Sequence, residues 1–113
     1  MTEDSLQARM VAYHNDKYRH KSILVHIANQ RQGTPQYALQ LKAMGVIAGF
    51  PDLALFWDGG YQLIEVKTET GKLSPKQIAF ADRAAQVANH KVALVRSLPE
   101  FCDLLDTLLG DQI

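Results

Sequence analysis

The sequence lacks the features that stabilise small proteins by means other than packing. Its only cysteine, Cys102, excludes an internal disulfide and a cysteine-rich zinc site. No apolar run approaches the roughly 20 residues that a membrane-spanning helix needs, and the acidic start at Glu3 and Asp4 is the wrong flank for a secretory signal. These absences predict an intracellular protein in a reducing compartment, with no membrane partner.

The chain also has no excess charge of either sign and few residues that break regular structure. Twelve Lys and Arg balance twelve Asp and Glu, and the 113 residues include seven Gly and four Pro. With 47% hydrophobic residues, this is the composition of an ordinary globular protein and not of a disordered or fibrous one. A chain of this length can bury one hydrophobic core but not two, so we expect a single domain over residues 1–113.

The charges are distributed unevenly along the chain. No acidic residue occurs from Lys17 to Pro51, and this segment contains five cations: Lys17, Arg19, Lys21, Arg31 and Lys42. Such a segment can face a polyanion, or its cations can simply be solvated. The charge pattern alone leaves both alternatives open. The candidate polyanion contacts are Lys21, Arg31 and Lys42.

Signals for helices and strands alternate along the chain. Expected helices cover residues 2–15, 34–44, 74–88 and 99–109, and expected strands cover residues 23–28, 53–57, 62–66 and 92–95. Three helix starts carry capping residues: Thr2, Thr34 before a proline, and Ser74 with Gln77 in a capping box. Because the strands are apolar on both faces, we expect an α/β fold in the order α-β-α-β-β-α-β-α, with a sheet covered on both sides.

Two apolar runs around Gly59 and Gly60 are typical of a β-hairpin. If these glycines are the two turn residues, paired positions sum to 119 and Asp52 lies opposite Lys67. Directly opposed residues share a face of the sheet, so Glu65 joins them at one end of the hairpin. A three-residue turn would flip one strand and break this convergence.

Two carboxylates beside a lysine on a covered sheet predict a cation site. Neighbouring carboxylates repel each other, so the pair needs a compensating cation. Lys67 supplies one charge, and Mg²⁺, or Mn²⁺ in its place, would supply the rest, held by Asp52, Glu65 and the carbonyl of Val66. Such a site can activate water for phosphodiester hydrolysis. A simpler alternative is an ion pair between Lys67 and one of the carboxylates, with no metal.

These residues resemble known nuclease motifs. Pro51-Asp52, then twelve residues, then Glu65-Val66-Lys67 look like the signature of the PD-(D/E)XK nuclease superfamily. The longer string is similar to the VRR-NUC family, the virus-type replication and repair nuclease module, in three segments: GFPDL at 49–53, LIEVKT at 63–68 and GKLSPKQ at 71–77. The resemblance extends from Glu3 to about Ser97 and implies a restriction-endonuclease-like α/β fold with a mixed four-stranded sheet flanked by helices.

The resemblance also implies roles for individual residues. The superfamily metal ligands fall on Asp52 and Glu65, and its catalytic lysine falls on Lys67. Family members carry a glutamate early in the first helix, which Glu3 matches, although Asp4 is equally well placed. The sequence does not decide between these two acids.

The resemblance places further residues on the helix after the ExK strand and in the loop after the first strand. Gln77 matches a family glutamine, and its alternative role is that of capping-box partner of the preceding serine. In the loop after the first strand, the family has a histidine followed by an asparagine, which His26 and Asn29 match. Because His26 lies in an apolar strand, we interpret it as a core residue. Gln30 and Arg31 stand where the family has an acid and a glycine. The candidate DNA contacts are Lys21, Asn29, Arg31, Lys42 and Lys72.

Together these features predict a Mg²⁺-dependent endodeoxyribonuclease of DNA replication or repair, without an organic cofactor, in the cytoplasm of a bacterial or phage-type system. No element for reading base edges is evident, so recognition of DNA by its shape is expected. The resemblance to stand-alone VRR-NUC members, which are similar to junction-resolving enzymes, implies branched DNA such as a Holliday junction as the substrate. Symmetric incision calls for a homodimer, with the apolar residues 99–109 as its surface. The alternative is a non-catalytic nucleic-acid-binding or assembly module that retains the nuclease fold.

Overall fold

The computed structural model describes residues 1–28 and 34–110. Asn29 and Arg31, two of the candidate DNA contacts, lie outside the described residues. The described elements are α1 (Glu3–Lys17), β1 (Ser22–His26), α2 (Pro35–Ala43), β2 (Leu53–Trp57), β3 (Gly60–Val66), α3 (Pro75–Ala88), β4 (Ala93–Val95) and α4 (Leu98–Leu109). This is the predicted order, and no helix within the described ranges is long and apolar enough to cross a membrane.

The helices begin where their capping residues predict. The Thr2 hydroxyl accepts the N–H of the third residue after it, and Thr34 caps α2, which has a proline in its first turn. Ser74 caps α3 in a complete capping box. α4 begins one residue earlier than predicted, because the hydroxyl of Ser97 accepts the N–H of Glu100. The local signals therefore fix the helix starts to within a residue.

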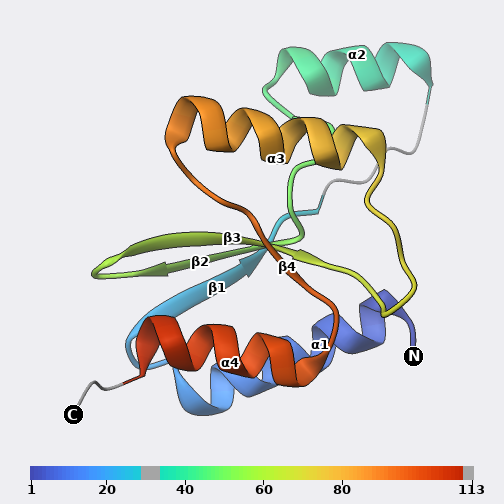
Figure 1. Cartoon of the computed structure of the whole chain (residues 1–113). Helices are drawn as coiled ribbons and strands as arrows, with labels where there is room; N and C mark the ends of the chain where they lie inside the picture. The colour runs from blue at the N-terminus through green and yellow to red at the C-terminus, as the bar shows by residue number, and fades with distance from the viewer. Residues whose placement is uncertain (29–33, 111–113) are drawn as a thin grey trace.

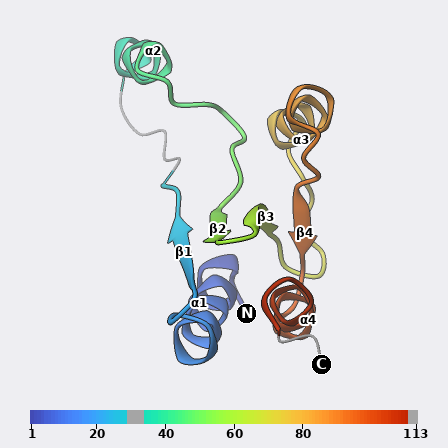
Figure 2. The same cartoon turned by 90° about the vertical axis from the view of Figure 1, so that its left-hand side faces the viewer.

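The four strands form one mixed sheet in the order β1-β2-β3-β4. β1–β2 and β2–β3 are antiparallel pairs, and β3–β4 is a parallel pair. Helices α1 and α4 lie on one face of the sheet, and α2 and α3 lie on the other (Figures 1 and 2). The core fills the space between the sheet and the α1–α4 pair, with these buried residues among its members: Leu6, Met10, Leu53, Leu55, Ile64, Val66, Phe101 and Leu105.

The register of the hairpin differs from the prediction. Trp57 pairs with Gly60, so Asp58 and Gly59 are the turn residues and paired positions sum to 117 instead of 119. The reason is local: a Cβ on Gly59 would lie 2.6 Å from the indole nitrogen of Trp57, and Gly60 has a φ of +152°, which suits glycine. The two sums differ by two, which is the period at which side chains alternate along a strand, so each side chain stays on the predicted face of the sheet. Continued by one residue, the observed register places Asp52 across from Glu65.

The second face of the sheet is less well covered than predicted. Ile23 and Phe56, on strands β1 and β2, are 67% and 46% exposed, and α2 has no buried residue. Figure 2 shows α2 above β1 and α3 above β4, well separated from each other. Apolar side chains therefore face solvent on the α2–α3 side of the sheet.

The terminal helix, in contrast, has no large apolar face to spare. Phe101 and Leu105 of α4 are fully buried, Leu109 is 5% exposed, and Leu104 and Leu108 pack against the core. α4 packs against α1 as well as against the sheet. The contact with α1 covers the second apolar face of α4. The prediction that residues 99–109 provide a dimer surface is therefore wrong.

Candidate active site

Asp52 is anchored at the point where β2 begins, between its two neighbouring strands. Its Oδ2 accepts the N–H of Val66 on β3 at 2.8 Å. Its main-chain oxygen accepts the N–H of Ile27 at 2.9 Å and lies 2.9 Å from Nδ1 of His26. The carboxylate consequently has little freedom, and its side chain is directed toward Glu65 on the same face of the sheet.

Glu65 lies near the end of β3 and is 3% exposed. Burial raises the pKa of its carboxyl group to about 9, together with the hydrogen bond to Asp52 and the negative charge of Asp52; the positive charge of Lys67 opposes the shift. The neutral form of Glu65 is therefore favoured at neutral pH when no cation is bound, and its proton lies in the hydrogen bond with Asp52. A bound cation could take the place of this shared proton.

Lys67 follows β3 directly, and its side chain is 12% exposed. Its Nζ lies 3.9 Å from Oε1 of Glu3, which α1 brings to the same place. Asp4 lines the same cleft as Glu3. Of the two acids that the sequence left open, Glu3 is the one paired with the lysine.

Gln77 makes both of the contacts that the sequence offered as alternatives. Its Oε1 accepts the N–H of Ser74 at 2.7 Å, which completes the capping box. Its Nε2 donates to Oε1 of Glu65 at 3.1 Å. The oxygen of the amide group thus binds the start of α3 and its nitrogen binds the buried carboxyl group. The residue that caps the helix therefore also orients Glu65.

A cleft of about 450 Å³ lies beside this group and is lined by residues that include Glu3, Gln7, His26, Asp52 and Gln77. Glu65 contacts two of these lining residues, Asp52 and Gln77, and Lys67 contacts a third, Glu3. His26 is exposed, and its Nδ1 lies 3.0 Å from Nε2 of Gln7. The interpretation of His26 as a core residue is therefore wrong. The missed signal is its place as the last residue of β1, beside the start of β2, where the cleft opens.

The candidate DNA contacts within the described residues do not gather at this cleft. Lys21 precedes β1, whose other end lies beside Asp52. The length of this strand separates Lys21 from Asp52 by roughly 15 Å. Lys42 lies on α2 and lines a groove between α2 and α3. Lys72 is exposed in the loop that follows Lys67. Of the candidate DNA contacts that the structure describes, Lys72 is the nearest in sequence to Lys67.

The donor set at the cleft suits a hard divalent ion. Within residues 1–28 and 34–110, no cluster of three or more His, Cys, Asp or Glu could hold a metal. The site offers the Asp52–Glu65 carboxyl pair, and Val66 lies between Glu65 and Lys67 with its carbonyl as the predicted further ligand. Two carboxylates with water molecules in the remaining positions are a common arrangement for Mg²⁺. The residues present therefore fit such an ion.

The comparisons with known proteins agree with the motifs. The model of the VRR-NUC domain family matches residues 1–98 of the chain. A solved structure described as a VRR_NUC domain protein has a TM-score of 0.73 at 18% identity, covering 96% of this chain and 88% of that chain, which shows a shared fold. No curated protein matches the chain. Since the family model covers most of its length, the chain belongs to the VRR-NUC family of nuclease domains, which cleave phosphodiester bonds.

Proposed function

We propose that the chain is a metal-dependent DNA endonuclease of replication or repair that selects its substrate by shape. The observation that carries this proposal is the buried carboxyl group of Glu65, which lies beside the carboxyl group of Asp52 and the ammonium group of Lys67. Burying such a pair is costly unless a cation compensates it. The family assignment supplies the reaction class, and the Asp52–Glu65 pair supplies a place for Mg²⁺.

Each residue of the site has a separate part in this reaction. A bound divalent ion supplies Lewis acidity and lowers the pKa of water. Asp52 and Glu65 would hold the ion, and the amide of Gln77 fixes the orientation of Glu65. The ammonium group of Lys67 orients the attacking water and stabilises charge that develops on the phosphate. Glu3 holds this ammonium group in place from α1.

The substrate we propose is branched DNA, in particular the four-way junction. The protein has no net charge, and the active-site cleft is small, so there is little surface for reading a base sequence. The test is incubation of the purified protein with labelled four-way junction, flap and plain duplex, with and without Mg²⁺ or Mn²⁺. Cleavage of the junction that depends on metal is expected. Binding without cleavage under all conditions would favour a non-catalytic module.

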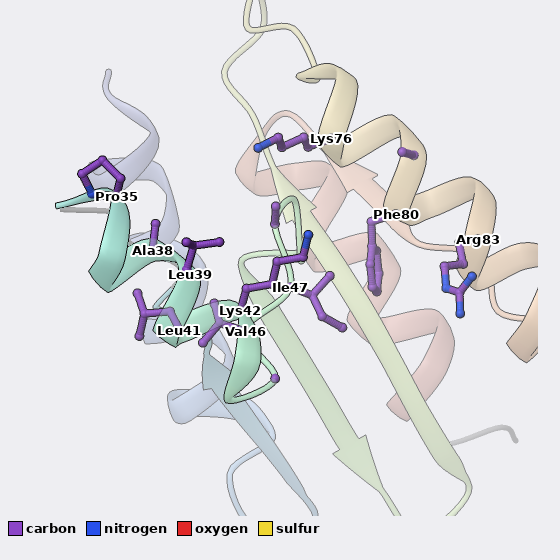
Figure 3. A pocket seen from close by; sticks show the side chains of 13 residues that line it. Pro35, Ala38, Leu39, Leu41, Lys42, Val46, Ile47, Lys76, Phe80 and Arg83 are labelled. Carbon is purple, nitrogen blue, oxygen red and sulfur yellow. The ribbon is translucent and has the colours of Figure 1, made fainter. Parts of the chain in front are cut away.

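We also propose that the protein is a homodimer, and that the second copy covers the groove between α2 and α3. This groove has a volume of about 890 Å³ and is lined mainly by apolar side chains, with Lys42, Lys76 and Arg83 also present (Figure 3). Leu39 of α2, which lines it, is 68% exposed. A helix without buried residues beside an uncovered apolar groove fits a second copy, whose own groove would be covered in return.

Light scattering is expected to give about twice the 12.6 kDa mass of one chain at micromolar concentration without DNA. Leu39→Glu should shift the protein to a folded monomer, because the side chain is already exposed in one copy. Ala12→Glu places the same charge on an exposed position of α1, on the other face of the sheet, and should leave the dimer intact. A wild-type monomer, or equal effects of the two variants, would contradict this interface.

A further prediction concerns the segment without acidic residues. If Lys21 and Arg31 contact phosphates, changing Lys21, Arg31 and Lys42 together to glutamine should weaken binding to every DNA and lower the salt-dependence slope by up to about two. Lys42 lines the groove assigned to the second copy, so a fall of about three would instead place DNA in that groove. Binding titrations across salt concentrations measure this, with light scattering to confirm that the oligomeric state is unchanged. Arg9→Gln on the exposed surface of α1 is the control and should leave the slope unchanged. An unchanged slope in the triple variant would return these cations to ordinary solvated surface.

A further inference from the structure

Arg96 leaves the sheet beside Lys67. Arg96 is the first residue after β4, Lys67 is the first residue after β3, and these two strands pair in parallel. The N–H of Lys67 donates to the carbonyl oxygen of Val95 at 3.0 Å. The main chain of Arg96 is fixed in turn, because its N–H donates to Oε2 of Glu100 at 2.7 Å. The guanidinium group thus has a firm base next to the lysine.

One guanidinium nitrogen of Arg96 contacts three main-chain oxygens of the loop after Lys67. Its Nη1 lies 2.8 Å from the oxygen of Thr68, 3.3 Å from that of Glu69 and 2.6 Å from that of Gly71. Hydrogen bonds from a charged donor are stronger than neutral ones, and the guanidinium group keeps its charge at every working pH. Arg96 therefore stabilises the closed conformation of this loop, residues 68–71.

The closed loop packs against the side chain of Lys67. The N–H of Gly71 donates to the oxygen of Thr68 at 3.2 Å, which forms a tight turn. A Cβ added to Gly71 would lie 3.5 Å from Cδ of Lys67 and 3.1 Å from Oγ1 of Thr68, so the backbone of Gly71 runs close beside the lysine stem. A free lysine side chain has many rotamers, and a wall along its stem restricts them.

We propose that Arg96 is a positioning residue for Lys67. It holds loop 68–71 closed against the lysine stem, and the ammonium group is thereby kept beside Glu65 and Glu3. The inference rests on the proposed nuclease function, in which Lys67 acts on the scissile phosphate. Since Arg96 acts through the lysine, its loss should affect the rate of the reaction and leave the binding of metal and DNA unchanged.

The test is Arg96→Gln in the full-length protein, with junction DNA and Mg²⁺. The value of kcat should fall at least about tenfold, because a displacement of roughly 1 Å in an active site can cost on the order of a hundredfold. KM for DNA and the calorimetric affinity for Mg²⁺ should stay within about twofold of wild type, since neither the carboxyl pair nor the DNA contacts are changed. The exposed Arg9→Gln is the matched control and should cleave like wild type.

Two further variants separate positioning from folding. Arg96→Lys keeps a positive charge but ends one atom short of the guanidinium nitrogen that contacts the loop oxygens, so its kcat should lie between those of wild type and Arg96→Gln and can be measured even if Arg96→Gln does not fold. Combining Arg96→Gln with Lys67→Ala should give a protein no slower than Lys67→Ala alone.

Three results would overturn the inference. The first is wild-type kcat in Arg96→Gln, or in Arg96→Lys if Arg96→Gln does not fold. The others are a loss confined to DNA affinity and a further loss in the double variant. If wild type cleaves and Arg96→Gln cleaves equally well, this inference fails while the proposed function stands. A wild-type protein that cleaves no DNA with any metal would overturn both.

Discussion

Replacing Asp52 or Lys67 is expected to lower cleavage at least about a thousandfold, but for different reasons. Loss of the Asp52 carboxylate should weaken metal binding as well as the rate, because the Asp52–Glu65 pair is the proposed ligand set. Loss of the Lys67 ammonium group should leave metal binding intact or make it tighter, since a cation beside the site is removed. Calorimetric metal titration, together with single-turnover cleavage, distinguishes these effects.

The structure indicates which substitutions make this comparison clean. Asp52→Ala would also leave the buried N–H of Val66 without its acceptor, whereas Asp52→Asn keeps an oxygen for that bond, removes the charge and places an NH2 group on the side where Asp52 accepts from Glu65. Lys67→Met likewise keeps a long apolar stem against the loop at Gly71. Asp103→Asn, an exposed carboxylate on α4, is the control. Equal losses of metal affinity in the Asp52 and Lys67 variants would contradict this division of roles.

Local signals in the sequence were sufficient for the helix starts and for the convergence of the site. Thr2, Thr34 and Ser74 cap helices through contacts within three residues, so their effect does not depend on the rest of the fold. Asp52 and Glu65 meet because alternation along a strand fixes the face on which each side chain lies. The convergence therefore survived an error of one residue in the turn, which changed the partner across from Asp52 but not the face.

The surface of the fold could not be predicted in the same way, since it depends on packing between distant segments. Asp106 on α4 accepts hydrogen bonds from the hydroxyls of Tyr13 at 2.7 Å and Tyr18 at 2.6 Å, and Lys17 lies 3.2 Å from it. These contacts hold α4 against the end of α1, and periodicity within α4 contains no information about them. From the sequence, the apolar residues of α4 therefore looked available for a partner chain. In the structure, exposed apolar residues such as Ile23, Leu39 and Phe56 belong instead to the α2–α3 side of the sheet.

The second large effect we expect is that Glu65→Gln stabilises the metal-free protein at alkaline pH while it abolishes activity. The folded protein holds a proton on Glu65 up to a pKa of about 9, whereas the unfolded chain releases it near the ordinary value of 4.5. Between these values the folded state binds more protons, so this contribution to stability is complete below pH 4.5 and is lost as pH rises through about 9. Glutamine keeps a hydrogen-bond donor for Asp52 and has no proton to lose.

Thermal unfolding in the presence of a chelator, from pH 5 to pH 9.5, measures this difference. The variant should unfold at a temperature close to wild type at pH 5. At pH 9.5 it should be more stable by at least about 2 kcal/mol, or about 8 °C in Tm for a chain of this size, because each unit of pKa difference contributes up to about 1.4 kcal/mol. Asp103→Asn should follow the wild-type curve, because that carboxylate is exposed on α4.

Addition of Mg²⁺ should reverse the order of the two proteins at alkaline pH. A ligand that binds only the folded state stabilises it, and metal affinity rises with pH when a ligand must first lose a proton. Wild type should therefore gain more stability from Mg²⁺ at pH 9 than at pH 6, and Glu65→Gln should gain little at either. If wild type and variant keep a constant difference in Tm across the pH range without metal, Glu65 does not hold the shared proton. A bound cation would then have no proton to replace, and the case for the Asp52–Glu65 pair as a metal site would rest on the family resemblance alone.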